Sequence, residues 1–175
     1  GGQLRLRAGG DVNGIDLVLF RGEAALLGHG EVSVDRVAAG NASVRVSAAS
    51  GLTLGEYIDP MLMRRDNRGV TQNSPSLVIG TTVENLQTTF FSYGPDSGVD
   101  LSTAAGTLAL RNLTTTVPKT TVADETNRLA NVTTELTGNV LPGDVRLAAP
   151  GGSISAERLA VMFPKRTGSL RLLAA

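Results

Sequence analysis

Residues able to catalyse a reaction are few in this sequence, and they do not gather around a nucleophile. The chain has no cysteine and a single histidine, His29, which lies between two glycines. A Ser-His-Asp hydrolase would have to use His29, and nothing near it supplies a nucleophile on a defined elbow. The lack of cysteine excludes disulfides, thiolate metal sites and cysteine catalysis. We expect no catalytic residue, no metal and no cofactor.

Paired carboxylates are the sharper candidate, because cleavage of a glycosidic bond uses two carboxyl groups at a set separation. The close pairs are Asp11 with Asp16, Asp96 with Asp100, and Asp124 with Glu125. Each pair falls at an expected corner or on an outward face, where carboxylates are normally solvated. We therefore predict that the chain is not an enzyme, and a carbohydrate-active protein stays as an alternative.

The elements that would position these residues repeat along the chain. A phrase of alternating apolar and polar residues, followed by a corner of Gly and Ala, begins near residues 4, 24, 44, 99, 145 and 170. Alternation with period two indicates strands with one buried face. Repeats about 20 residues apart indicate a solenoid, in which each turn pairs with the turns above and below it. The sequence therefore predicts an all-β solenoid.

The alternation also predicts which residues share a face. We expect one interior column to contain Leu6, Val46, Leu101, Leu147 and Leu172. The central outward positions are Arg45, Asp100, Arg146 and Arg171. If the turns stack in sequence order, Asp100 lies between two arginines, where its charge relieves their repulsion. This register is a hypothesis that the structure can test.

Two insertions interrupt the spacing, at about 55–97 and 111–142. In the first, Asp59 and Pro60 predict a short helical turn through Arg65. The second is rich in threonine and predicts an exposed excursion, with a β-hairpin around Pro118 and Asp124. The stretch 156–163 fits a helix or a strand, and the repeat favours a strand. We interpret 1–175 as one segment of a longer chain, because its last strand carries no cap.

Aromatic side chains are scarce, at 3% of the residues, and most of them lie in the first insertion. They are Tyr57, Phe90, Phe91 and Tyr93. One interpretation is that they pack the insertion against the solenoid. The other is that they form a contact surface for a glycan or a protein, because aromatic rings supply such contacts.

The charge balance argues against two classes of partner. Lys plus Arg and Asp plus Glu each number 16, so the formal net charge is zero. A neutral chain has no general attraction for nucleic acid or for an anionic membrane surface. No apolar run approaches the roughly 18 residues of a membrane-spanning helix. We expect no nucleic-acid partner, no membrane insertion and a monomeric chain.

Specific residues resemble a known family. The stretch 90–112 resembles a recurring phrase of bacterial exoproteins of the filamentous haemagglutinin family, in which aromatic residues precede Tyr-Gly-x-Asp-Ser and an alternating strand. Tyr93, Gly94, Asp96, Ser97 and Gly106 fall on its positions, and Pro95 departs from it. The stretches 56–63 and 159–175 resemble the neighbouring elements, so the resemblance covers most of the chain from about residue 50 onward.

The resemblance implies a right-handed parallel β-helix in a secreted or outer cell-surface protein of a Gram-negative bacterium. It implies export by two-partner secretion, with an outer-membrane transporter as the export partner. Such proteins act as adhesins or biofilm matrix proteins, and the expected role is structural or adhesive, toward a glycan or protein receptor. The alternative within the family is the stalk of a contact-dependent inhibition toxin.

Overall fold

The structure is a computed structural model that describes residues 2–59, 92–111, 115–116, 120–123, 129–132, 135–136, 139–157 and 160–175. Within these ranges the chain forms strands and connecting corners, and none of these residues is helical. The predicted all-β class is therefore confirmed for this part of the chain. The helical turn expected from Asp59 to Arg65 falls, apart from Asp59, outside the described residues.

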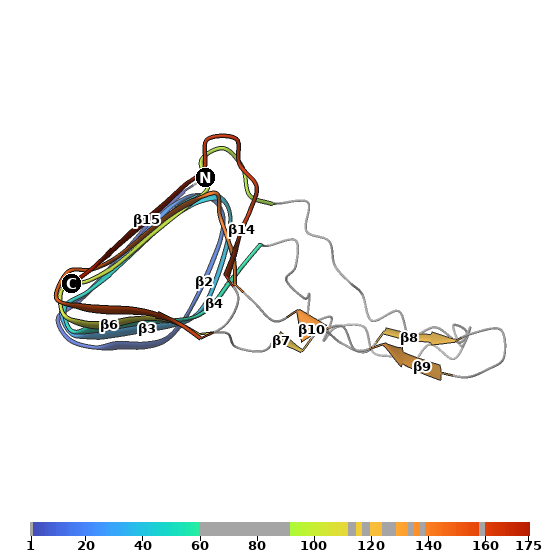
Figure 1. Cartoon of the computed structure of the whole chain (residues 1–175), viewed down its shortest axis with the longest axis horizontal. Helices are drawn as coiled ribbons and strands as arrows, with labels where there is room; N and C mark the ends of the chain where they lie inside the picture. Colours follow the sequence, from blue (N-terminus) through green and yellow to red (C-terminus); the bar gives the residue numbers. More distant parts are fainter. Residues whose placement is uncertain are drawn as a thin grey trace.

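The main sheet has nine strands, and every pairing in it is parallel. Its strands are β1 (Gly2–Ala8), β2 (Val12–Gly28), β3 (Glu31–Ala48), β4 (Gly51–Ile58), β5 (Gly98–Thr103), β6 (Gly106–Leu110), β12 (Asp144–Ala149), β13 (Gly152–Ala156) and β15 (Ser169–Ala174). The sheet wraps around a nearly closed, three-sided outline (Figure 1).

Each strand pairs with a segment one repeat away, as the recurring phrases predict. Arg36 and its neighbour Glu56 are 20 residues apart. Across the first insertion the separation is 55, between Ser47 and Ser102. The strands after the second insertion and at the C-terminal end resume the same columns. The insertions therefore return the chain to the register that it left.

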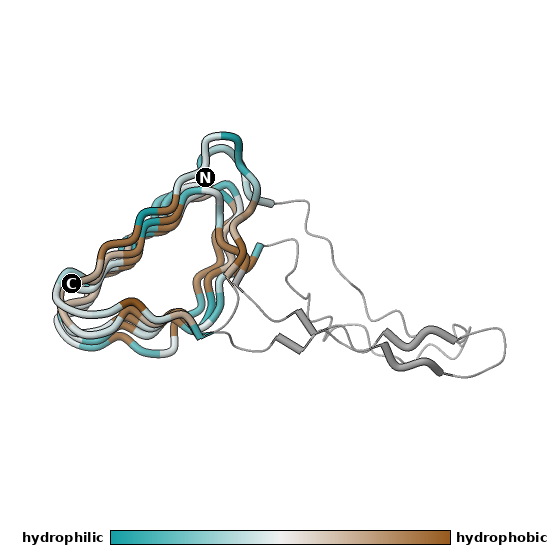
Figure 2. The backbone as a smooth tube through the Cα atoms, in the orientation of Figure 1, coloured by the Kyte–Doolittle hydropathy of each residue, from teal (hydrophilic) through white to brown (hydrophobic). Residues whose placement is uncertain are grey.

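The interior column predicted from the alternation is confirmed. In the strand register, Leu6, Leu26, Val46, Leu101, Leu147 and Leu172 follow one another as direct partners. The four inner members are at most 4% exposed, whereas Leu6 and Leu172, on the two outermost strands, are 36% and 61% exposed. Apolar stretches recur on all three sides of the outline (Figure 2).

Two strands are longer than the sequence predicts. β2 has 17 residues and β3 has 18, because pairing continues around a corner instead of stopping at it. Gly22, inside β2, has a φ of 119°, and a Cβ there would lie 2.2 Å from the carbonyl oxygen of Gly2. Glycine therefore lets this strand bend against its neighbour without losing its ladder, since other residues rarely adopt such a φ.

The insertions are shorter than predicted at two of their ends. Residues 55–58 belong to β4, and residues 139–141 form β11 (Asn139–Leu141). β11 pairs in parallel with β14 (Ala160–Met162), which confirms the preference for a strand in 156–163.

The hairpin predicted in the second insertion is also confirmed. β8 (Thr120–Ala123) pairs antiparallel with β9 (Leu129–Val132), and β7 (Thr115–Thr116) pairs antiparallel with β10 (Glu135–Leu136). These four strands lie outside the three-sided outline (Figure 1). Pro118 and Asp124, around which the hairpin was expected, are not among the described residues.

The interior column generates a matched pair of variants. Leu101→Ala removes a side chain with 0% exposure and should lower the free energy of unfolding by about 2–5 kcal/mol. Leu172→Ala, at the exposed end of the same column, should change it by less than about 1 kcal/mol. Chemical denaturation followed by circular dichroism measures both, and equal losses would contradict the shared column.

Candidate functional site

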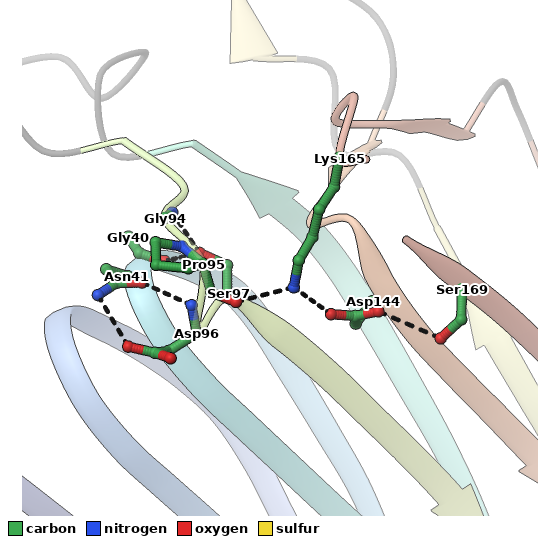
Figure 3. Close-up of polar contacts among 9 residues, drawn as sticks. All are labelled: Gly40, Asn41, Gly94, Pro95, Asp96, Ser97, Asp144, Lys165 and Ser169. Atoms are coloured by element: carbon green, nitrogen blue, oxygen red, sulfur yellow. Dashed lines mark hydrogen bonds and ion pairs between the residues drawn. The ribbon is translucent and has the colours of Figure 1, made fainter. Parts of the chain in front are cut away.

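Polar side chains gather at one corner of the outline (Figure 3). This polar corner consists of Gly40, Asn41, Gly94, Pro95, Asp96, Ser97, Asp144, Lys165 and Ser169. They come from the middle of β3 and from the starts of, or the segments before, β5, β12 and β15. Because these strands are neighbours in the parallel sheet, residues far apart in the sequence meet there.

Asn41 and Asp96 hold two of these segments together. The backbone N–H of Asp96 donates to Asn41 Oδ1 at 2.9 Å, and Asn41 Nδ2 donates to Asp96 Oδ2 at 3.3 Å. A Cβ on Gly94 would lie 2.3 Å from Asn41 Oδ1. The glycine of the Tyr-Gly-x-Asp-Ser motif is therefore needed so that the asparagine can approach.

Ser97 completes a tight turn at the same place. Its backbone N–H donates to the carbonyl of Gly94 at 3.1 Å, which closes a four-residue turn with Pro95 at a position that favours proline. The Ser97 hydroxyl donates to the carbonyl of Gly40 at 2.8 Å and accepts from the N–H of Gly94 at 2.6 Å. Ser97 is only 2% exposed, so the motif serine has a structural task.

Lys165 joins the turn to the strands that follow it. Its Nζ donates to the carbonyl of Pro95 at 2.8 Å and also to the carboxylate of Asp144. The hydroxyl of Ser169 donates to the other oxygen of Asp144 at 3.2 Å. The ammonium group of Lys165 therefore bridges the segment before β5 and the first residue of β12 (Figure 3).

These contacts also bear on acid–base chemistry. The hydrogen bond from Lys165 lowers the pKa of Asp144, and the hydroxyl of Ser169 acts in the same direction. A general acid in glycoside cleavage needs the opposite, a carboxyl group whose pKa is raised so that it keeps its proton near neutral pH. Asp144 is thus suited to joining neighbouring strands and not to donating a proton near neutral pH.

The aromatic residues singled out in the sequence have different locations. Tyr57 and Tyr93 are buried, with 0% and 9% exposure, and their ring centroids are 6.3 Å apart. Tyr93 also meets Phe163 edge to face at 5.2 Å, and its hydroxyl donates to the carbonyl of Val140. Burial raises the pKa of both tyrosines above the usual range. These two rings pack inside the protein, which leaves them little surface to offer a partner.

The other two members of the predicted contact surface, Phe90 and Phe91, lie outside the described residues. The structure does describe the two points where the first insertion leaves and rejoins the sheet. There the hydroxyl of Ser92 donates to Asp59 Oδ2 at 2.5 Å. Asp59 is 6% exposed, so the base of the insertion is closed by a partly buried hydrogen bond.

An arginine column runs along the outer face of β1, β2, β3, β5, β12 and β15. In register its positions are Arg5, Ala25, Arg45, Asp100, Arg146 and Arg171. The carboxylate of Asp100 lies 3.4 Å from Arg45 Nε and 3.4 Å from Arg146 Nη1. The predicted position of Asp100 between two arginines is confirmed.

The remaining chemical candidates do not converge. His29 is exposed at a corner, where its backbone N–H donates to the carbonyl of Ala8. Asp11 accepts a hydrogen bond from the N–H of Glu31 at 2.8 Å, while Asp124 and Glu125 lie outside the described residues. A search of the described residues found no group of three or more metal-binding side chains and no helix able to span a membrane.

Sequence reasoning missed several members of the polar corner. Asn41, Lys165 and Ser169 carry no local signal, because each finds its partners 21 or more residues away. The available signal was the repeat itself, since aligning the phrases places Ser169 beside Asp144. Gly94, Asp96 and Ser97, which the resemblance singled out, do lie in this corner, where each takes part in a hydrogen bond.

The arginine column generates a double-mutant cycle. Asp100→Asn should destabilise the chain by about 0.2–1 kcal/mol, because two exposed arginines lose their shared carboxylate. Combined with Arg146→Gln, part of this loss should disappear. Denaturation at low salt measures the coupling, and high salt should weaken it. Zero coupling at low salt would contradict the ion pair.

Asp144 generates a pH prediction. Because its pKa is lower in the folded chain than the unfolded value of about 3.9, its stabilising effect is present above that value and is lost as the pH falls through the folded pKa. Asp144→Asn should therefore lower Tm at pH 7, and the difference from wild type should shrink between about pH 5 and pH 2. Asp16→Asn, at an exposed position, is the control. A difference independent of pH would refute the assignment.

Comparisons with models of protein families, with curated proteins and with solved structures found no match. The chain's own geometry is therefore the basis for a function: the shared interior column, the polar corner and the arginine column.

Proposed function

We propose that this chain is a right-handed parallel β-helix serving as a structural and adhesive segment of a large bacterial exoprotein, an adhesin or a biofilm matrix protein related to the filamentous haemagglutinin family. Its site of action would be the outer surface of a Gram-negative cell or the medium, after export through an outer-membrane transporter. The observation that carries the proposal is the in-register stacking of Leu6, Leu26, Val46, Leu101, Leu147 and Leu172.

Stacking of this kind suits a rod. Each segment contacts only the segment before and after it, so that a chain can be lengthened by further repeats without redesign of its core. The parallel pairing supports the proposed handedness, because crossover connections between parallel strands of one sheet are right-handed in about 98% of cases. The lack of cysteine is compatible with export as an unfolded chain.

The distribution of polar groups favours a structural role over an enzyme. A glycosidase needs two carboxyl groups facing each other across a groove. Among the described carboxylates, Asp96 is bonded to Asn41, Asp100 lies between two arginines, and Asp144 pairs with Lys165. Each is used to join neighbouring strands, which is what a stack of repeats requires.

The hairpin formed by β7–β10 is the best candidate for receptor contact in this proposal. It projects from the three-sided outline (Figure 1). Tyr57 and Tyr93, by contrast, are buried. Binding residues commonly lie on loops that a rigid scaffold holds in place. The receptor class that we propose is a glycan or a protein on a cell surface.

A hairpin replacement tests this proposal. Residues 113–137 are replaced by a short Gly-Ser linker, and wild type and variant are compared on a glycan array and on cultured host cells. Binding should fall by at least about tenfold in the variant, while Tm stays within a few degrees. The control inserts the same linker at the exposed corner after Gly9.

Three results would overturn parts of the proposal. Equal binding by wild type and the linker variant would remove the hairpin from the receptor surface. Release of reducing ends from a panel of polysaccharides by the wild-type chain would favour the enzyme. A crystal structure with left-handed winding would reject the fold that we propose.

A further inference from the structure

Two positions of the arginine column lie between a pair of arginines. One gap is filled by a carboxylate, and the other is empty because it holds only the small side chain of an alanine. Asp100 fills the gap between Arg45 and Arg146, and its carboxylate lies 3.4 Å from a nitrogen of each. Two strands toward the N-terminal end, Ala25 occupies the equivalent position between Arg5 and Arg45. Neighbouring strands are about 4.8 Å apart, so the two pairs of arginines have the same backbone spacing of roughly 10 Å.

At the empty gap, Ala25 forms the floor of a hollow on the outer face of β1, β2 and β3. The hollow has a volume of about 270 Å³, and its outward-facing lining is Arg5, Arg7, Ala25, Leu27, Arg45 and Ser47. Leu27 is partly exposed on the same face of β2 as Ala25, so the floor of the hollow is apolar, and Arg5, Arg7 and Arg45 border it.

Two of the three arginines at this hollow have unused charge. Neither Arg5 nor Arg7 has an ion-pair partner among the residues that the structure describes. The neighbouring carboxylate on β2, Glu23, accepts a hydrogen bond from Gln3 at 3.4 Å. Arg5 and Arg7 therefore border an apolar floor without an ion pair of their own among the described residues.

We propose that this hollow binds an oxyanion, which is a carboxylate or a sulfate group. The oxyanion lies above Ala25, between Arg5 and Arg45, as the carboxylate of Asp100 lies between Arg45 and Arg146. Planar guanidinium groups hold such oxyanions through paired, charge-assisted hydrogen bonds. The scaffold that carries the oxyanion has an apolar face and covers Leu27. The site depends only on the strand register and on these side chains, so it does not rest on the proposed function.

Binding is tested with four probes at low ionic strength: methyl sulfate, phenyl sulfate, glucuronate and phenyl glucuronide. Titration is followed by the backbone amide signals of Ala25 and Leu27 in NMR spectra of the ¹⁵N-labelled chain. Phenyl sulfate should bind at least about threefold more tightly than methyl sulfate, which carries the same single charge, because the ring buries apolar surface on Leu27. A preference for the glucuronides over the sulfates identifies a carboxylate ligand, and the reverse identifies a sulfate ligand.

Substitutions at positions 25 and 100 make the test specific, because one should remove a binding site and the other should create one. Ala25→Asp supplies an internal carboxylate and should weaken phenyl sulfate binding by at least about tenfold, whereas Ala25→Ser should leave it within about twofold. Asp100→Ala empties the second gap and should create a second binding event, reported by the amide of residue 100. Circular dichroism checks that each variant is folded.

The result that overturns the proposal is equally defined. If Ala25→Asp and Ala25→Ser bind phenyl sulfate alike, or if the shifted amides lie away from β1–β3, the hollow is not an oxyanion site. Absence of a second event in folded Asp100→Ala would also overturn it, because Arg45 and Arg146 flank residue 100 at the same backbone spacing at which Arg5 and Arg45 flank Ala25. Binding of methyl sulfate as tight as that of phenyl sulfate would remove Leu27 from the site.

Discussion

The structure depends on one constraint: each inward side chain must lie directly on the inward side chain of the neighbouring strand. Val46 and Leu101 illustrate it, since both have 0% exposure and are direct partners across the first insertion. A slip of one residue would turn Arg45 into the interior and Val46 toward water, because successive side chains of a strand point to opposite faces. Between β3 and β5, register is therefore enforced by the cost of burying a charged side chain.

The same constraint decides what the outer face can carry. Residues at equivalent positions of the repeat become neighbours, so like charges meet unless the column is interrupted. Asp100 interrupts it with an opposite charge, and Ala25 interrupts it with no charge at all. The second solution gives Arg5 no carboxylate partner among the described residues, and it leaves a hollow over the small side chain of Ala25.

The insertions must satisfy the register as well, and the contacts beside them show how. Ser92 bonds to Asp59 where the chain rejoins the sheet after the first insertion, and the turn from Gly94 to Ser97 then directs it into β5. Lys165, which follows the second insertion, joins that turn to Asp144 at the start of β12. The hydrogen bonds and the ion pair at this corner therefore hold neighbouring strands and their connecting segments in place.

The sequence by itself determined the strands, their facing and their register, because period-two alternation and a recurring phrase encode all three. It therefore predicted the column from Leu6 to Leu172 and the place of Asp100. Only the tertiary structure decided that β2 and β3 continue around corners, that Tyr57 and Tyr93 are buried, and that Lys165 reaches both Pro95 and Asp144. These features depend on side-chain reach between distant segments, and local spacing along the chain carries no record of that reach.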